Sequence, residues 1–584
     1  MNDRWDLSFL YTGFDDPKYE ADLKTLQEKI AAYGKLLETS GDDRTKLESL
    51  MDADEEINRL LEHLSLFAGM TLAVDANNLD AARYEDKLNL IYNDLRLLQS
   101  AMIRYVGGLT NLEELIASSS KLQAVAFALR EMASNASHLM PADIEPWILQ
   151  MRLSGGTAFS QLRDKLDSNH MVHYRGQDLP LPAVRGMAYD PDASVRKDAY
   201  EAEIASYKKI ELPMSYCLNS IKMEARTLAK AKKYDSVLDM TLHQSRMDQE
   251  TLDAMWTAIR EYLPHFRRYL RAKAKYLGYE DGLPFYDLFA PVGHGGRTYT
   301  VEEARAKLLL EMGKFTPKMA DFMDNAFEQR WIDMYPREGK TGGAFCAGVH
   351  NDDRSLVMTN FQGSFSDVST IAHELGHAWH NRCLAGLPYC MIETPMPLAE
   401  TASIFNETML AHQVLSSATE EEQFTLLENS LMEATQTVVD IYSRYLFENE
   451  VVDTRADHVM SVDELKDAML RAQEASYGDG LAKDVRHPYM WACKSHYYSS
   501  ELNFYNFPYA FGLLFGKGVF AQYLRKGEAF VDDYCRLLRY CGSDTVANVA
   551  ASVGIDVRSV DFWRSSLEVI KQDVDRFCEL CEKQ

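Results

Sequence analysis

The chain has 584 residues, 46% of them hydrophobic and 26% charged, which is enough for a large core and for more than one domain. Acidic residues number 88 against 62 basic ones, a formal net charge of -26, so we expect neither nucleic acid nor an anionic membrane as a partner. The nine scattered cysteines favour a reducing cytoplasm over a disulfide framework. The charged start, Met1–Asp6, predicts no secretory signal, and no apolar run approaches the roughly 18 residues of a membrane span.

Apolar residues at spacings of three and four predict helix after helix in the first part of the chain. The clearest stripes are Leu23, Leu26, Ile30, Tyr33 and Leu37, followed by Tyr84, Leu88, Ile91, Leu95 and Leu98. We interpret both stripes as the core-facing sides of helices. A polar stretch broken by proline and glycine, 167–192, is the predicted boundary between an N-terminal helical lobe, 1–185, and the rest of the chain, 186–584.

Helices are predicted again from about Ser194, and Thr300 and Glu303 have the spacing of a capping box at the start of another helix. The exception is 342–365, where two apolar runs flank the turn-rich His350-Asn351-Asp352-Asp353. This pattern predicts a β-hairpin. The next segment, about 367–383, again has helical spacing. The predicted fold class is therefore mainly α, with a small β-sheet beside one helix.

That helix carries an H-E-x-x-H motif, His373-Glu374-Leu375-Gly376-His377. Histidines four apart lie on the same helix face, so both imidazoles can reach one metal ion. Glu374 is one position round the helix, where it can accept the proton of a metal-activated water. A surface helix has this pattern by chance in roughly a few per cent of proteins of this length, so the motif needs support from its neighbours.

Catalytic zinc takes three protein ligands and keeps a fourth position open to water. His380 shares the face of His373 but lies about 10.5 Å further along the helix axis, too far to bind the same ion. Glu393 precedes a Thr-Pro-Met-Pro stretch that we do not expect to be helical, whereas Glu400 is predicted in the first turn of the next helix. We therefore predict Glu400 as the third ligand. Glu407, two turns further on, is predicted to orient a ligand histidine through its far nitrogen, with a solvated surface carboxylate as the alternative.

Together these residues resemble the oligoendopeptidase F branch of the thimet-oligopeptidase-type zinc metallopeptidases. The stretches that carry the resemblance are 5–8, 283–291, 342–346, 367–378, 399–407 and 504–512. They reach from near the start of the chain to beyond residue 510. The resemblance implies a two-lobed helical body with a deep channel between the lobes and one zinc ion on its floor. It also implies that 186–584 is the catalytic zinc-peptidase domain.

The resemblance implies further catalytic residues as well. In the family, a histidine and several tyrosines face the metal across the site. Carried over to this chain, they are His496, Tyr498, Tyr505 and Tyr509, which are predicted to polarise or hold the scissile carbonyl. Phe507 stands where many members have tyrosine. The alternative is an aromatic helix core whose phenols are satisfied elsewhere.

The hairpin is the predicted substrate shelf, because an extended peptide can add to a free strand edge. The predicted substrate-binding residues are Gly343, Ala344, Phe345 and Cys346. Gly343 and Gly348 lack side chains that would keep a peptide backbone away. Without the resemblance, a purely structural hairpin fits the residues equally well.

We predict a zinc-dependent endopeptidase that hydrolyses internal bonds of short unstructured peptides, with Glu374 as general base. One alternative is a zinc exopeptidase or dipeptidase, which would need an anchor for a free terminus. The other is a non-catalytic peptide-binding relative, which the intact His373, His377 and Glu400 argue against. Two histidines and one carboxylate can also bind cobalt or manganese. We expect a cytoplasmic monomer or small homo-oligomer whose partners are short peptides.

Overall fold

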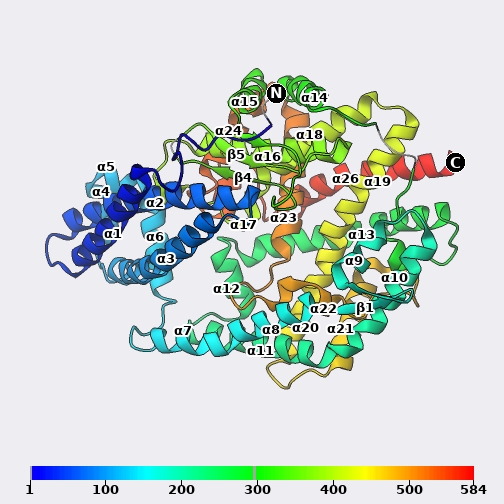
Figure 1. Ribbon diagram of the computed structural model, residues 1–584, viewed down its shortest axis with the longest axis horizontal. Helices are drawn as coiled ribbons and strands as arrows, with labels where there is room; N and C mark the ends of the chain where they lie inside the picture. The colour runs from blue at the N-terminus through cyan, green and yellow to red at the C-terminus, as the bar shows by residue number, and fades with distance from the viewer. Residues whose placement is uncertain (1–2, 294–296, 351, 584) are drawn as a thin grey trace.

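Amphipathic helices make up most of the chain in the computed structural model, which describes residues 3–293, 297–350 and 352–583 (Figure 1). Asn351, in the predicted turn of the hairpin, lies outside the described residues. Within the part of the chain that is described, no helix is both long and apolar enough to cross a bilayer.

The first helices follow the predicted apolar stripes, and polar caps mark where they begin. Asp16 accepts a hydrogen bond from the backbone of the first turn of α1, and Asp42 and Asn78 cap α2 and α3 in the same way. Tyr33 in α1 and Leu95 in α3 are buried, as their spacing predicts. The helices are α1 (Pro17–Glu38), α2 (Asp43–Val74), α3 (Leu79–Gly107), α4 (Leu112–Ser118), α5 (Ser120–Ala124), α6 (Ala126–Ala136), α7 (Glu145–Ser154) and α8 (Gly156–Ser168).

Buried side chains form two large hydrophobic clusters. One runs from Leu10 to Leu129 and is joined by Met391, and the other runs from Val172 to Leu580. A small third cluster joins Trp5 and Met70 to Leu356 and Met358. The clusters divide the helices into two bodies, as the predicted fold class requires. The domain limits 1–185 and 186–584 and the deep channel stay predictions.

The polar stretch 167–192 contains regular structure that its composition did not predict. The strands β1 (Met171–Tyr174) and β2 (Gln177–Pro180) pair as an antiparallel hairpin. At Thr300 the predicted capping box is confirmed, since Thr300 Oγ1 accepts from Glu303 N at 3.2 Å and Glu303 Oε2 accepts from Thr300 N at 2.9 Å. The helices of this region are α9 (Leu181–Gly186), α10 (Ala193–Ser206), α11 (Glu211–Ala231), α12 (Val237–Gln244), α13 (Gln249–Tyr276), α14 (Val301–Phe315) and α15 (Pro317–Glu328).

The predicted hairpin is confirmed and belongs to a three-stranded sheet. β4 (Phe345–Gly348) pairs antiparallel with β5 (Ser355–Met358), and β3 (Ile332–Asp333) pairs parallel with β5 on its other side. The order β3-β5-β4 leaves β4 at the edge of the sheet. Its strands are shorter than the apolar runs suggest. Gly343, with a φ of 82°, and Ala344 precede β4 rather than belonging to it.

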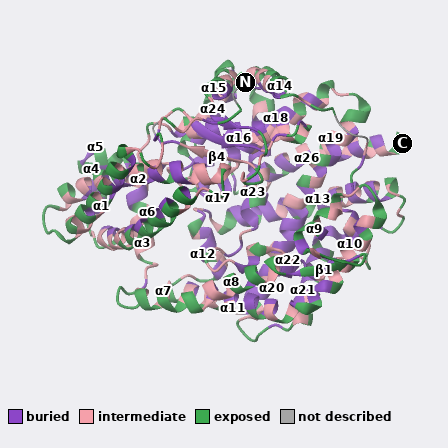
Figure 2. Ribbon diagram, in the orientation of Figure 1, coloured by how far each residue is buried: buried purple, intermediate pink, exposed green. Residues whose placement is uncertain are grey.

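The C-terminal helices build the larger core around α16. This helix packs on α18, α18 packs on α23, and α23 packs on α26. Figure 2 shows buried ribbon concentrated in α16 and in the helices around it. The helices are α16 (Phe365–Leu384), α17 (Met396–Ala399), α18 (Thr401–Ser417), α19 (Glu420–Thr435), α20 (Ile441–Thr454), α21 (Val462–Tyr477), α22 (Met490–Cys493), α23 (Phe507–Lys526), α24 (Val531–Tyr540), α25 (Val546–Ala551) and α26 (Val560–Lys583).

A buried ion pair fixes the segment that enters α23. Lys222 of α11 and Glu448 of α20 have side chains 0% and 1% exposed, and Nζ lies 2.6 Å from Oε1. Lys222 also donates to Asn503 Oδ1 at 3.1 Å. Glu448 accepts from Phe504 N at 2.9 Å and from Asn506 Nδ2 at 2.7 Å. The pair therefore holds Phe504 in its left-handed conformation, with a φ of 52°.

Replacing Lys222 with methionine would leave the Glu448 carboxylate buried without its cation. We expect the free energy of unfolding to fall by about 3–5 kcal/mol, because an uncompensated buried charge is costly. The measurement is the urea midpoint. Lys24→Met removes an exposed pair with Glu28 and is the control expected to change little. Equal midpoints for both variants would contradict the role given to the buried pair.

Candidate metal-dependent active site

The metal helix α16 begins at a reciprocal cap. Ser364 Oγ accepts from Asp367 N at 3.1 Å, and Asp367 Oδ2 accepts from Ser364 N at 2.9 Å. The helix then runs from Phe365 to Leu384, which includes the segment predicted from the sequence. His373 and His377 therefore lie one turn apart on the same face of a well-capped helix.

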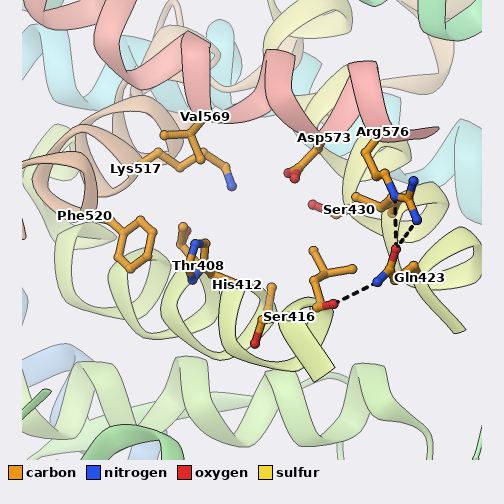
Figure 3. A pocket seen from close by; sticks show the side chains of 13 residues that line it. Thr408, His412, Ser416, Gln423, Ser430, Lys517, Phe520, Val569, Asp573 and Arg576 are labelled. Carbon is orange, nitrogen blue, oxygen red and sulfur yellow. Dashed lines mark hydrogen bonds between the residues drawn. The ribbon is translucent and has the colours of Figure 1, made fainter. Parts of the chain in front are cut away.

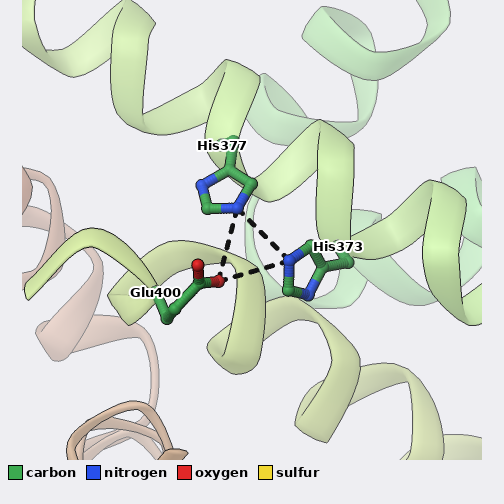
Figure 4. A group of neighbouring side chains, drawn as sticks. All are labelled: His373, His377 and Glu400. Carbon is green, nitrogen blue, oxygen red and sulfur yellow. Dashed lines mark hydrogen bonds and ion pairs between the residues drawn. The ribbon is translucent and has the colours of Figure 1, made fainter. Parts of the chain in front are cut away.

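The three predicted metal ligands converge (Figure 4). Glu400 Oε2 lies 3.2 Å from His373 Nε2 and 3.4 Å from His377 Nε2. The two Nε2 atoms are 3.2 Å apart. A tetrahedral site with metal–ligand bonds of about 2.0–2.1 Å has ligand atoms about 3.3–3.4 Å apart. The three atoms are thus spaced as three corners of such a site.

Glu400 was predicted in the first turn of a new helix. In the structure it lies between two helices instead. α17 begins at Met396, because Pro397 is tolerated in a first helical turn. Glu400 follows α17 with φ -87° and ψ 6°, and α18 begins at Thr401. Ser403 Oγ donates to Glu400 Oε2 at 2.6 Å and so orients the carboxylate. This contact was not predicted from the sequence.

Two glycines let the helices approach closely enough for this convergence. A Cβ on Gly376 would lie 2.7 Å from Ala402 O, so α16 and α18 touch there through backbone. A Cβ on Gly512 would lie 3.0 Å from Glu400 Cβ, so α23 presses on the ligand itself. Asn406 Nδ2 also ties α18 to α16 by donating to Ala372 O at 3.2 Å. Gly376, Gly512 and Asn406 lie within the motifs noted in the sequence, but their role in bringing the helices together follows only from the packing.

Glu407 lies where an orienting carboxylate is needed. Its Oε1 is 3.1 Å from His373 Nδ1, the nitrogen that faces away from Glu400. Burial alone would lower the pKa of His373, but hydrogen bonds to Glu400 and Glu407 raise it to about 10. A divalent cation can take the place of that proton. Burial would raise the pKa of Glu400, and its bonds to His373 and His377 hold it well below its usual range instead.

Glu374 is 5% exposed, and its Oε2 is buried without a hydrogen-bond partner among the described residues. Burial raises the pKa of this carboxyl group, and the neighbouring histidines oppose the shift. A buried carboxylate oxygen without a partner is costly unless a bound molecule satisfies it. Glu374 Oε2 is therefore available to accept a proton close to His373, His377 and Glu400.

His380 is turned away from the site, as its distance along the helix predicts. It is buried, and its Nε2 lies 3.1 Å from Leu538 O in α24. Burial lowers its pKa to about 4. His380 is therefore a neutral core residue that links α16 to α24.

The structure brings three of the four predicted aromatic residues together. His496 Nε2 is 3.4 Å from Tyr509 Oη, and the ring of Tyr505 lies 5.5 Å from that of His496 and 5.2 Å from that of Tyr509. Tyr509 lines the same cavity of about 390 Å³ as His373 and Glu400, which we call the metal cavity. The histidine and two phenols therefore form one group beside the metal ligands.

Tyr498 lies apart from this group. It is 1% exposed, and its ring lies under the guanidinium of Arg163, which is 5.4 Å from the ring centre. No described residue accepts a hydrogen bond from its hydroxyl. The catalytic role predicted for Tyr498 stays a prediction that this position does not favour.

His496 and Tyr509 are both uncharged at neutral pH. Burial, together with the charges of Arg444 and Lys494, lowers the pKa of His496 to about 4, so the imidazole is neutral. Burial and a hydrogen bond with Tyr505 raise the pKa of Tyr509 above its usual range. Tyr509 therefore carries an O–H that can donate to a developing oxyanion.

The predicted substrate strand has a free backbone edge, but its side chains already have partners. Phe345 packs against Trp5, with ring centres 6.3 Å apart, and Asn381 Nδ2 lies 3.8 Å from Cys346 Sγ. A Cβ on Gly348 would collide with Asn381 at 2.7 Å, so that glycine makes room for α16 rather than for a peptide. Of the two predicted glycines, Gly343 has nothing within 4 Å of its Cβ position, as expected of a substrate contact.

Comparison with known proteins identifies the family. The model of peptidase family M3 matches residues 186–569. The chain belongs to this family. It is 21% identical to oligopeptidase PepF of Bacillus subtilis (strain 168), over 100% of this chain and 88% of that protein. It is 23% identical to an oligoendopeptidase F homolog of Lactococcus lactis subsp. lactis (strain IL1403), over 99% of this chain and 97% of the relative.

Solved structures share the fold. A crystal structure from Chlamydophila abortus has a TM-score of 0.85 at 22% identity, covering 99% of this chain and 98% of its own. The oligoendopeptidase-F of Enterococcus faecium has a TM-score of 0.73 at 17% identity, with 97% and 99% covered. The resemblance drawn from the sequence is thus confirmed for the family and the fold, and with it a metalloendopeptidase of the oligoendopeptidase F type.

A methyl group at Gly376 should separate α18 from α16. We expect Gly376→Ala to weaken zinc binding by about 10- to 100-fold, because displacing a ligand by a few tenths of an ångström loosens the site. Zinc titration of the metal-free protein measures this. Gly69→Ala is the matched control, since that glycine is also within a helix but has nothing within 4 Å of its Cβ position. Unchanged zinc affinity in Gly376→Ala would contradict the close-contact account.

Proposed function

We propose that the protein is a zinc-dependent endopeptidase that cleaves internal bonds of short, unstructured peptides. The convergence of His373, His377 and Glu400 beside the unpartnered carboxylate of Glu374 carries the proposal. Family membership makes a peptide bond the target, and the relatives' names, oligopeptidase and oligoendopeptidase, support short peptides cut internally. All nine cysteines are free thiols, which supports a reducing compartment such as the cytoplasm.

The three ligand residues fit a single zinc ion. Two imidazole nitrogens and one carboxylate oxygen are a common donor set of catalytic zinc, and their mutual distances of 3.2, 3.2 and 3.4 Å suit its tetrahedral geometry. When bound, zinc would polarise the scissile carbonyl and bring the pKa of a bound water close to 7. Glu407 holds His373 in the tautomer that directs Nε2 at the ion.

Glu374 is the general base of the proposed mechanism. Its Oε2 takes the proton of the attacking water and then passes it to the nitrogen of the leaving amine. Burial of the side chain at 5% exposure keeps bulk water away from the carboxylate, so its raised pKa suits a group that both accepts and releases a proton.

Tyr509 and His496 would stabilise the oxyanion that forms when water attacks. Tyr509 is the phenol that lines the metal cavity, and its retained proton makes it a donor. Neutral His496 lies behind it at 3.4 Å and Tyr505 packs on both. The free edge of β4 supports a substrate that adds as an extended strand, held through backbone from Gly343 to Cys346.

The direct test compares wild type with Glu374→Gln on a terminally blocked, internally quenched peptide, with bound zinc quantified. We expect about one zinc per chain in both proteins and internal cleavage by the wild type alone, because only the base is lost. Removal of zinc by a chelator should abolish cleavage, and zinc should restore it. Zinc-loaded wild type that trims only unblocked ends would favour an exopeptidase, and one that cuts nothing would favour a non-catalytic relative.

Tyr509→Phe removes only the proposed oxyanion donor. We expect kcat to fall by about 10²- to 10³-fold while zinc content stays the same, as is typical when one such donor is lost. Tyr497→Phe is the control, because that phenol is buried in the same segment as His496 and its hydroxyl has no partner among the described residues, so its loss breaks no contact. Equal kcat values in the two variants would remove Tyr509 from the mechanism.

A further inference from the structure

A second cavity opens beside the metal cavity. It has a volume of about 320 Å³ and lies between α18, α19, α23 and α26 (Figure 3). We call it the side cavity. Five residues line both cavities, so the two are adjacent; they are Thr408, Ala411, Leu415, Ser430 and Lys517.

The Lys517 side chain is largely buried, and its ammonium group forms no ion pair with the described residues. The residue is only 7% exposed, and no hydrogen bond or ion pair joins its ammonium group to any described residue. Figure 3 shows its side chain reaching from α23 into the side cavity. A largely buried side chain that presents an unpaired ammonium group to a cavity can bind an anion there.

No charged group around the cavity forms an ion pair with Lys517 among the described residues, although two carboxylates feel its charge. Asp573 of α26 also points into the cavity (Figure 3), but no ion pair joins it to Lys517; burial raises its pKa to about 6, and the charge of Lys517 opposes the rise. Glu400, Glu407 and Glu433 line the metal cavity together with Lys517, and no ion pair joins any of the three to Lys517. Arg576 is already engaged, since it donates to Gln423 Oε1 at 2.9 and 3.1 Å.

Lys517 lies at a fixed distance from the proposed oxyanion donor. Tyr509, Leu513 and Lys517 are four residues apart on one face of α23, so about 12 Å of helix separates the first from the last. That span corresponds to three or four residues of an extended peptide. A Cβ on Gly516 would lie 2.7 Å from Ile404 Cβ, so α23 is pressed against α18 along this stretch.

We propose that the side cavity binds a carboxylate of the peptide substrate, with Lys517 as its counter-ion, three or four residues from the scissile bond. The inference rests on the proposed peptidase function and adds a specificity determinant to it. The hydroxyls of Thr408 and Ser430 offer further donors at the junction of the two cavities, and Asp573 can accept from a backbone N–H. The carboxylate comes either from an aspartate or glutamate side chain or from the C-terminus of the peptide.

The test uses two pairs of internally quenched peptides. One pair differs only by glutamate against glutamine, three or four residues from the cleaved bond. The other ends at that distance and differs only by a free C-terminus against a carboxamide. For wild type we expect the carboxylate member of one pair to have a kcat/KM at least about tenfold higher, mainly through KM, and that pair identifies the source.

The preference should disappear in Lys517→Met and persist in Lys517→Arg, which keeps the charge. It should also persist in Lys526→Met, a control on the same helix whose exposed ammonium group pairs with Asp533 at 3.3 Å. Equal kcat/KM within both pairs for wild type overturns the proposal without any variant. A preference that survives in Lys517→Met overturns it as well.

Failure of the inference is separable from failure of the proposed function. If wild type cleaves the neutral peptides as well as the charged ones, the endopeptidase stands and the side cavity has no such role. Binding of the same peptides to zinc-loaded Glu374→Gln, followed by fluorescence anisotropy, reports the carboxylate preference without any turnover. About tenfold tighter binding of the charged peptide supports the inference, and equal affinity contradicts it.

Discussion

The site depends on how closely three helices pack around Glu400. Its carboxylate can meet both histidines of α16 only because α18 touches α16 at Gly376, where a Cβ would lie 2.7 Å from a backbone oxygen. α23 closes the other side at Gly512, where even one added carbon would lie 3.0 Å from Glu400 Cβ. Backbone cannot yield as a flexible side chain does, so these contacts set the ligand distances within a few tenths of an ångström. The Ser364–Asp367 cap fixes where α16 begins, and the buried Lys222–Glu448 ion pair fixes the segment that enters α23.

Charge within the site is arranged around the same point. Three carboxylates, those of Glu374, Glu400 and Glu407, surround two imidazoles in a part of the molecule where burial strengthens every electrostatic interaction. Such a group favours a cation at its centre. On the facing side the groups are neutral donors instead. Partial burial and the charges of Arg444 and Lys494 lower the pKa of His496, and partial burial with a hydrogen bond to Tyr505 raises the pKa of Tyr509. Negative charge gathers on the metal side, and the donors lie where an oxyanion would develop.

Local patterns in the sequence predicted helices, caps and the spacing of residues within one helix. They did not predict contacts that arise when helices pack together. The spacing of His373 and His377 is a property of one helix, so it could be predicted from the residues alone. Glu400 was predicted as a ligand, but its position between α17 and α18 depends on a proline that a first helical turn tolerates. The contacts of Gly376 with Ala402 and of Gly512 with Glu400 join elements that are apart in the chain, which no local pattern encodes. Tyr498 shows the same limit, because the short turn Ser495–Tyr498 directs His496 to the site and buries Tyr498 against Arg163.

The central claim is that two histidines and one glutamate, held by this packing, form a single metal site. Zinc K-edge X-ray absorption on the zinc-loaded protein tests it most directly. We predict two imidazole nitrogens and oxygen ligands at about 2.0–2.2 Å, with Glu400→Gln losing zinc affinity. A sulfur ligand at about 2.3 Å, or unchanged coordination and affinity in Glu400→Gln, would contradict the account.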